Sequence, residues 1–373
     1  MRRKYFINVL LITTVYIAIL VIRSSEVFAY QIDPELIDRY LRSQDIPHDV
    51  PGRLFLSDDE IHIAAGYLYA KGADPTDYNF QHPPLVKYFY GFSTIATQNP
   101  LLVQIVFGLL LILTTYFLSI KLFGREKLYV SLIPSILLIS DPLTMTLAAK
   151  ALLDLPQALF ALLFLISMLF FPKNVYWQGI SLGLFIASKF WGAALFFFIF
   201  IAAFNLFIKK ISLKQIIIIF VIALLFFSLT YLVSFVKLEG RFNIVFFELK
   251  TLKYWLNHSV TSVPFASVIL FTTGFMKSWW SSEQWIRGIV WNPLWTISFF
   301  SASWLFFNRI KKKRLDAFFV ISAMAILYVF YLGFQAPFER YFVIVLPFFY
   351  ICLTFAAHEF SRKKLDFFLK LLK

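Results

Sequence analysis

Long runs of hydrophobic residues alternate with short polar or basic segments along almost the whole chain. One run covers residues 5–22, and others recur as far as residue 356. A helix rises about 1.5 Å per residue, so roughly 20 apolar residues cross the ~30 Å hydrocarbon layer of a bilayer. The pattern therefore predicts an all-α integral membrane protein. Because no long polar linker interrupts it, we expect one membrane domain over residues 1–373.

The basic clusters orient the predicted helices. Cytoplasmic loops are rich in Lys and Arg, so Arg2, Arg3 and Lys4 place the N-terminus in the cytoplasm. Residues 176–208 have basic residues at both ends, which predicts two short helices that turn at Ser188-Lys189. About ten spans result, with both termini cytoplasmic: 5–22, 101–120, 128–139, 152–171, two within 176–208, 216–235, 291–307, 318–332 and 341–356.

Two long segments then fall on the extracytoplasmic side. The first, residues 23–99, holds eleven of the 21 acidic residues and only six Lys or Arg. The second, residues 237–288, contains four tryptophans of the kind that gather at membrane interfaces. Its apolar piece 263–275 is too short to span, so we expect interfacial helices in both segments. The tryptophans are Trp255, Trp279, Trp280 and Trp285.

Composition narrows the class of protein. The chain is 60% hydrophobic and 15% charged, which excludes an ordinary soluble domain. The net charge of +14 comes from clusters beside apolar runs, so it indicates membrane topology and not nucleic-acid binding. Residues 1–29 fit a signal peptide or a retained helix, and the length of the apolar run favours the retained helix. Cys352 is the single cysteine, so no intrachain disulfide is possible.

The first candidate for chemistry is the acidic cluster Asp58-Asp59-Glu60. It directly precedes residues 61–69, whose mixed pattern predicts a helix on the membrane surface. The cluster has two interpretations. Acids favour the first turn of a helix, with Ser57 or Asp58 as N-cap, and they are also the groups that accept protons in catalysis.

A second candidate follows about twenty residues later, at His82-Pro83-Pro84-Leu85-Val86-Lys87. Two prolines predict a rigid helix start with a histidine and a lysine on either side. Taken alone, this is only a helix boundary. In the same external segment as an Asp-Glu-x-His element, it forms an unusual combination.

This combination resembles the protein O-mannosyltransferase family of the GT-C membrane glycosyltransferases. That family carries Asp-Glu-x-His-Phe and then His-Pro-Pro-Leu-Gly-Lys in its first luminal loop, and this chain departs only at Ile63 and Val86. The family's Ser-Arg-x-x-Leu-Leu-Asp is similar to 149–154, with Lys150 in place of arginine. Its Ser-x-Lys-Trp-x-Gly is similar to 188–192. Weaker similarities occur at 278–280 and 337–347.

The resemblance implies a GT-C bundle and an inverting transfer of a sugar, mannose in that family, from a polyprenyl-phosphate donor to an acceptor hydroxyl. It implies Asp59 as the base and Glu60 as the group that orients a protein or glycan acceptor. No cofactor is required, and no nucleic acid takes part. Donor phosphate or sugar binding falls to Arg340, Lys189, Lys150, His82 and Lys87, with His62, Asp154 and Lys277 in support.

Other interpretations stay open at this point. The cations are also placed to reach lipid headgroups, and Asp154 is placed to form a buried ion pair with Lys150 one turn earlier. His62 and His82 do not match a known zinc or calcium spacing, so a divalent metal is the weaker alternative. A GT-C enzyme with another sugar or acceptor, a transporter and a scaffold protein are the competing functions. Inverted repeats, which many transporters have, are not evident here.

Overall fold

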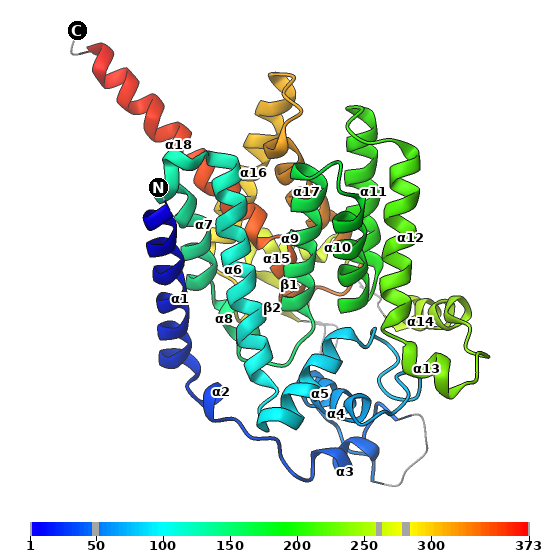
Figure 1. Cartoon of the computed structure of the whole chain (residues 1–373). Helices are drawn as coiled ribbons and strands as arrows, with labels where there is room; N and C mark the ends of the chain where they lie inside the picture. The colour runs from blue at the N-terminus through cyan, green and yellow to red at the C-terminus, as the bar shows by residue number, and fades with distance from the viewer. Residues whose placement is uncertain (1, 47–51, 259–262, 278–283, 372–373) are drawn as a thin grey trace. The chain divides into compact units, whose positions relative to one another are not determined.

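The computed structural model describes residues 2–46, 52–258, 263–277 and 284–371, and within this part the chain is mainly helical (Figure 1). It forms two compact units. Unit 1 comprises Met1–Ile17, Ile112–Met145 and Val260–Lys373. Unit 2 comprises Ala18–Leu111 and Thr146–Ser259. The single domain expected from the sequence stays a prediction.

Three helices have residues in both units, and unit 2 contains the whole first external segment, residues 23–99. The shared helices are α1 (Arg2–Ser24), α6 (Leu101–Phe123) and α8 (Pro142–Ala148). The other helices of unit 2 are α2 (Glu26–Ala29), α3 (Leu36–Leu41), α4 (Asp58–Ala70), α5 (Leu85–Thr97), α9 (Asp154–Phe170), α10 (Val175–Ser188), α11 (Gly192–Phe207), α12 (Leu213–Leu229), α13 (Leu232–Lys237) and α14 (Ile244–His258).

Unit 1 contains the remaining elements. They are the short helix η1 (Arg125–Lys127), α7 (Leu128–Ser140), α15 (Ala266–Thr273), β1 (Phe275–Lys277), β2 (Trp285–Arg287), α16 (Pro293–Lys311), α17 (Ala317–Leu332), the 3-10 helix η2 (Glu339–Ile344) and α18 (Leu346–Leu371). Strands β1 and β2 form an antiparallel pair. The apolar piece expected on the membrane surface is α15 and β1, and Ala266, Leu270 and Phe271 are buried in it.

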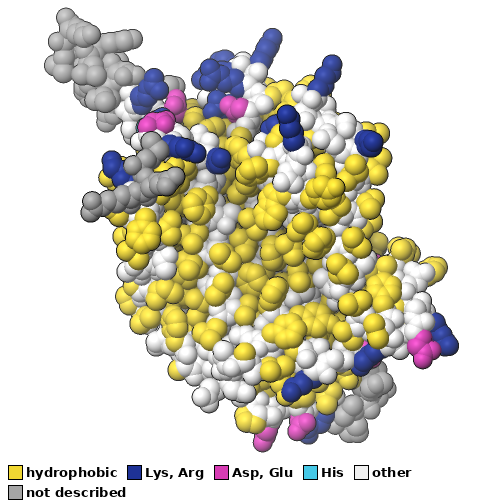
Figure 2. Space-filling model, viewed as in Figure 1, with side chains coloured by type: hydrophobic (Ala, Val, Ile, Leu, Met, Phe, Trp, Pro, Cys, Tyr) yellow, Lys and Arg dark blue, Asp and Glu magenta, His cyan; other side chains and the backbone are white. Residues whose placement is uncertain are grey.

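Every predicted span contains a helix of this structure. The stretch 176–208 divides into α10 and α11 around Lys189, as the basic residues at its ends predicted. Among the described residues, Lys4–Ser24 and Leu101–Phe123 are long and apolar enough to cross a membrane. A third candidate is Arg125–Ser140 with Pro142–Ala148, bent by 65°. In each unit, hydrophobic side chains cover the flanks of the long helices and Lys and Arg lie towards the helix ends (Figure 2).

Glycines bring α10 and α12 together in unit 2. A Cβ added to Gly179 would lie 2.6 Å from Ile222 Cβ, and one added to Gly183 would lie 2.7 Å from Phe226 Cβ. The two glycines are four positions apart, so both lie on one face of α10. Small residues at this spacing let membrane helices approach closely. The contact holds α12 against α10 in the helix bundle of unit 2.

Unit 2 has two chemically different ends. Helix α9 begins and α10 ends beside α4 and α5, at the lower end of the unit in Figure 1. The basic residues Lys173, Lys209 and Lys210 follow the opposite ends of α9 and α11. The acidic cluster and the basic loops therefore lie at opposite ends of the same helices.

Candidate functional site

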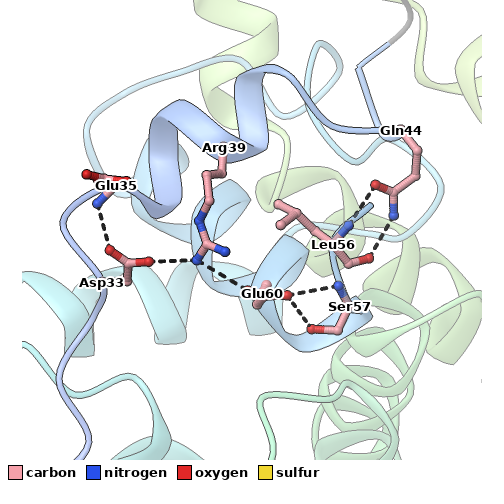
Figure 3. A network of polar contacts seen from close by, with 7 residues as sticks. All are labelled: Asp33, Glu35, Arg39, Gln44, Leu56, Ser57 and Glu60. Carbon is pink, nitrogen blue, oxygen red and sulfur yellow. Dashed lines mark hydrogen bonds and ion pairs between the residues drawn. The ribbon is translucent and has the colours of Figure 1, made fainter. Parts of the chain in front are cut away.

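The acidic cluster forms the first turn of α4, where Glu60 closes a capping box with Ser57 (Figure 3). The Ser57 backbone N–H and hydroxyl both donate to Glu60 Oε2, at 3.0 and 2.7 Å. Arg39 Nη2 lies 3.3 Å from Glu60 Oε1 and 2.7 Å from Asp33 Oδ2. Burial acts to raise the pKa of Glu60, but Ser57 and Arg39 outweigh it, so the pKa lies below its ordinary value. Both oxygens of Glu60 thus serve the local structure.

Asp59 lies one residue earlier and shares none of these contacts. Its side chain is half-buried, and it makes no hydrogen bond or ion pair with any other residue that the structure describes. Its charge acts on Tyr90 of α5: burial raises the pKa of Tyr90, and Asp154 and Asp59 raise it further. Asp59 is therefore a carboxylate on a fixed helix turn whose oxygens remain available to a ligand.

Helices α4 and α5 cross at a contact between two glycines. A Cβ added to Gly66 would lie 2.2 Å from the Lys87 carbonyl oxygen, and one added to Gly91 would lie 1.9 Å from the Gly66 oxygen. Both obstacles are backbone atoms, which cannot swing aside as a flexible side chain does. The acidic motif and the His-Pro-Pro motif are held together by this crossing.

Lys87 lies fully buried behind the His-Pro-Pro turn. Its Nζ donates to Asn79 O at 2.7 Å, Asn79 Oδ1 at 2.9 Å and His82 O at 2.7 Å. An ammonium has three N–H donors, so this shell is complete. Burial lowers the pKa of Lys87 to about 7, against an opposing contribution from Asp45. Asp45 in turn accepts from the Asn79 backbone N–H and side-chain amide.

A row of aromatic rings joins the motifs. The rings of His62 and His82 lie 6.0 Å apart, and those of His82 and Trp255 lie 5.0 Å apart. Trp255 also lies 5.8 Å from Phe190, and its Nε1 donates to Gln81 O at 2.9 Å. The sequence placed Trp255 in an interfacial belt. Within unit 2, its ring packs against His82 of the His-Pro-Pro turn.

The segment before α9 passes directly beside α4. His62 Nδ1 lies 3.0 Å from Ala151 O, and the Tyr90 hydroxyl donates to Leu152 O at 2.9 Å. Asp59 lies one turn before His62, on the same side of α4. The contact of His62 therefore places this side of α4 against the segment that precedes α9. Lys150 is exposed and makes no hydrogen bond or ion pair with a described residue.

Asp154 is buried in an ion pair, as expected, but its predicted partner is wrong. Lys189 Nζ, and not Lys150, lies 2.5 Å from Asp154 Oδ1. Lys189 follows the last residue of α10 in an extended conformation, which carries its side chain across to the start of α9. Only 11% of the Lys189 side chain is exposed, whereas Lys150 is exposed.

Glu248 in α14 was not predicted. Trp191 Nε1 donates to its Oε2 at 3.0 Å and the Tyr231 hydroxyl to its Oε1 at 3.2 Å. Burial raises the pKa of Glu248, and these two hydrogen bonds oppose that effect without cancelling it. Glu248 and Trp255 are seven residues apart and so share a face of α14. The seven-residue spacing of Glu248 and Trp255 was the signal in the sequence from which Glu248 could have been found.

Arg340 and Lys277 belong to unit 1, whereas the other eight predicted site residues belong to unit 2. The Arg340 guanidinium lies 5.2 Å from the centre of the Phe338 ring and 5.8 Å from that of Tyr341. The neighbouring Glu339 accepts from the backbone N–H groups of Ile289 and Val290 at 3.1 and 3.0 Å. Trp279 and Trp280 lie outside the described residues.

The described part of the chain contains no cluster of side chains typical of a metal site. No group of three His, Cys, Asp or Glu side chains there is arranged to hold a metal ion. His62 Nδ1 contacts a carbonyl oxygen, and the two histidine rings pack edge to face. This arrangement offers one carboxylate, Asp59, that no described residue binds, on the helix whose His62 belongs to the row of aromatic rings.

No protein-family model and no curated protein matches the chain. Solved structures are similar in fold. ArnT from Cupriavidus metallidurans bound to undecaprenyl phosphate is 17% identical, with a TM-score of 0.57, over 86% of this chain and 58% of that chain. Apo ArnT is 15% identical, with a TM-score of 0.57, over 86% and 57%. The chain thus spans less than three fifths of ArnT. It is an integral membrane protein with the GT-C fold.

Proposed function

We propose that this protein is a glycosyltransferase that takes a sugar from a polyprenyl-phosphate donor on the extracytoplasmic face of the membrane. The observation that carries the proposal is the pair of adjacent carboxylates in α4: Glu60 is bound on both oxygens, whereas Asp59 is bound on neither among the described residues. The GT-C fold supports it, and so does the undecaprenyl phosphate bound to ArnT. The separation of acidic and basic ends in unit 2 supports the extracytoplasmic side.

Asp59 acts as the general base in this proposal. It takes the proton of an acceptor hydroxyl while that oxygen forms a bond to the anomeric carbon of the sugar. The bond between that carbon and the phosphate oxygen breaks, and polyprenyl phosphate leaves with the electron pair. One displacement inverts the configuration at the sugar carbon. Glu60 positions Asp59 by capping α4.

Lys150 is the unit 2 cation that we assign to the donor phosphate. Its side chain is exposed, and the next residue, Ala151, contacts His62 of α4 through its carbonyl oxygen. A cation there stabilises the charge that develops on the leaving phosphate. Lys189 is paired with Asp154, and Lys87 donates to the backbone of the His-Pro-Pro turn, so both lysines stabilise the local structure. His82 packs in the row of aromatic rings. Arg340 keeps its proposed phosphate role, and Lys277 its supporting role, on the motif resemblance alone.

The sugar is proposed to be mannose and the acceptor a protein Ser or Thr hydroxyl. Both follow from the two motifs shared with the protein O-mannosyltransferase family, at Asp59 to His62 and His82 to Lys87. A lipid or glycan acceptor uses the same base and the same displacement. The proposed base and displacement are therefore the same for each class of acceptor.

The test is sugar transfer in membranes supplied with polyprenyl-phosphate mannose. Asp59→Asn keeps the shape of the side chain but removes the base, so transfer is expected to fall by about 10²- to 10⁴-fold. Asp58→Asn, at the exposed neighbouring position, is the matched control and should retain transfer. Undiminished transfer by Asp59→Asn at normal expression would remove Asp59 from the mechanism.

A further inference from the structure

Helix α14 has two faces of different character. Its inner face carries Glu248, buried Thr251 and Trp255, which contact the candidate site or the rest of unit 2. Its outer face carries four apolar side chains that are more than half exposed: Val245 (65%), Phe246 (71%), Leu249 (53%) and Leu256 (69%). Val245, Leu249 and Leu256 follow helical spacing, so they form one stripe.

Helices α12 and α13, which precede α14 in the chain, also expose apolar side chains. Helix α12 exposes Ile217, Val221, Leu224 and Leu225, and α13 continues with Leu232 and Val236. Helix α14 then runs across the end of α12 instead of along it (Figure 1). At 15 residues, and with three charged side chains, it is too short and too polar to span. Hydrophobic side chains over α14 are visible on the surface in Figure 2.

The charges beside the stripe are mostly positive. Lys253 lies on the exposed arc between the apolar residues, and Lys250, Lys237 and Arg241 are also exposed. Glu239 is the single exposed acid among residues 232–258. Lysine side chains beside an apolar stripe extend to the headgroup level, where they meet lipid phosphates. This combination of charge and apolar area fits an anionic bilayer surface.

We propose that α14 is an interfacial helix that lies in the surface of an anionic leaflet, with Val245, Phe246, Leu249 and Leu256 in the acyl boundary and Lys253 at the phosphates. The opposite face of the same helix holds the candidate site in shape. Trp255 fixes the His-Pro-Pro turn through Gln81 O, and Glu248 fixes the break after α10 through Trp191. Lipid contact on one face thus supports the loops on the other.

The experiment measures the depth of α14 in nanodiscs made from phosphatidylcholine alone or with phosphatidylglycerol. The full chain is used in a Cys352→Ala background, because Cys352 is the only cysteine and is buried. A nitroxide at Leu249→Cys is expected to collide several-fold more with oxygen than with a water-soluble nickel chelate. Phe246→Cys is the second position. Asp38→Cys, at an exposed site on α3, is the control and should favour the chelate.

Three outcomes would overturn the proposal. Chelate access at Leu249→Cys equal to that at Asp38→Cys would place α14 in water. Shielding from both reagents would mean that another protein chain covers the face. In phosphatidylglycerol discs, Lys253→Glu is expected to shift the label towards the chelate; no shift would remove the anionic preference. None of these results depends on the transfer reaction, so they separate this inference from the proposed function.

Discussion

Lys189 Nζ lies 2.5 Å from Asp154 Oδ1 and joins the break after α10 to the first residue of α9. The two residues are 35 positions apart, and both side chains are largely buried. Removing one partner of such a pair leaves the other charge buried and unpaired, which costs far more than the pair itself contributes. This contact therefore sets the relative position of two motifs that the sequence could only treat separately.

Breaking this pair is expected to destabilise the protein, and removing both charges is expected to restore much of the loss. Asp154→Leu or Lys189→Met alone should lower the free energy of unfolding by roughly 3–5 kcal/mol, and the double variant by clearly less than the sum. Denaturant unfolding of the purified chain in detergent measures this. Additive losses in the double variant would show that the two charges do not interact.

The glycine crossing of α4 and α5 is expected to tolerate no added methyl group. Gly91→Ala places a Cβ 1.9 Å from Gly66 O, so the helices must separate, and overpacking of this kind costs on the order of 1–3 kcal/mol or more. Thermal unfolding should show a lower midpoint. Ala96→Ser, which adds one atom on the exposed side of α5, is the control and should leave the midpoint unchanged. Equal midpoints for the two variants would argue against this crossing.

The capping box predicts a local dependence on pH. The pKa of Glu60 is below the ordinary value of 4.5, so its contribution to stability is present above 4.5 and is lost as the pH falls through the folded-state pKa. Hydrogen exchange of the Ile61 amide, which is bonded to Ser57 O, should lose protection as the pH falls below 4.5, after correction for intrinsic exchange. Glu60→Gln should abolish that change. Identical pH profiles for both proteins would contradict the assignment.

Lys150 is expected to contribute to binding of the donor phosphate. Hydrogen bonds to charged groups contribute about 1.5–3 kcal/mol, so Lys150→Ala should weaken binding of undecaprenyl phosphate by roughly tenfold or more. Lys150→Arg keeps the cation and should bind. Lys173→Ala, an exposed lysine at the opposite end of unit 2, is the control. The readout is ligand-induced thermal stabilisation, and full stabilisation of Lys150→Ala would exclude the role.

The positions of the long helices could be predicted because they depend on local pattern. Hydrophobic run length and the alternation with basic clusters place a helix in each of the ten predicted spans, including the division around Lys189. The first turn of α4 could also be predicted, because Ser57 and Glu60 have the spacing of a capping box. These features need only the residues within a few turns of each other.

Contacts between distant segments required the tertiary structure. Asp154 has one lysine four residues earlier and another 35 residues later. Only the path of the chain from α9 to the end of α10 brings Lys189, and not Lys150, to Asp154. Likewise, Lys87 is surrounded by Asn79 and His82, and Trp255 and Glu248 reach Gln81 and Trp191 across unit 2. Spacing along a chain limits which groups are able to meet, but packing selects the partners that bury their charges.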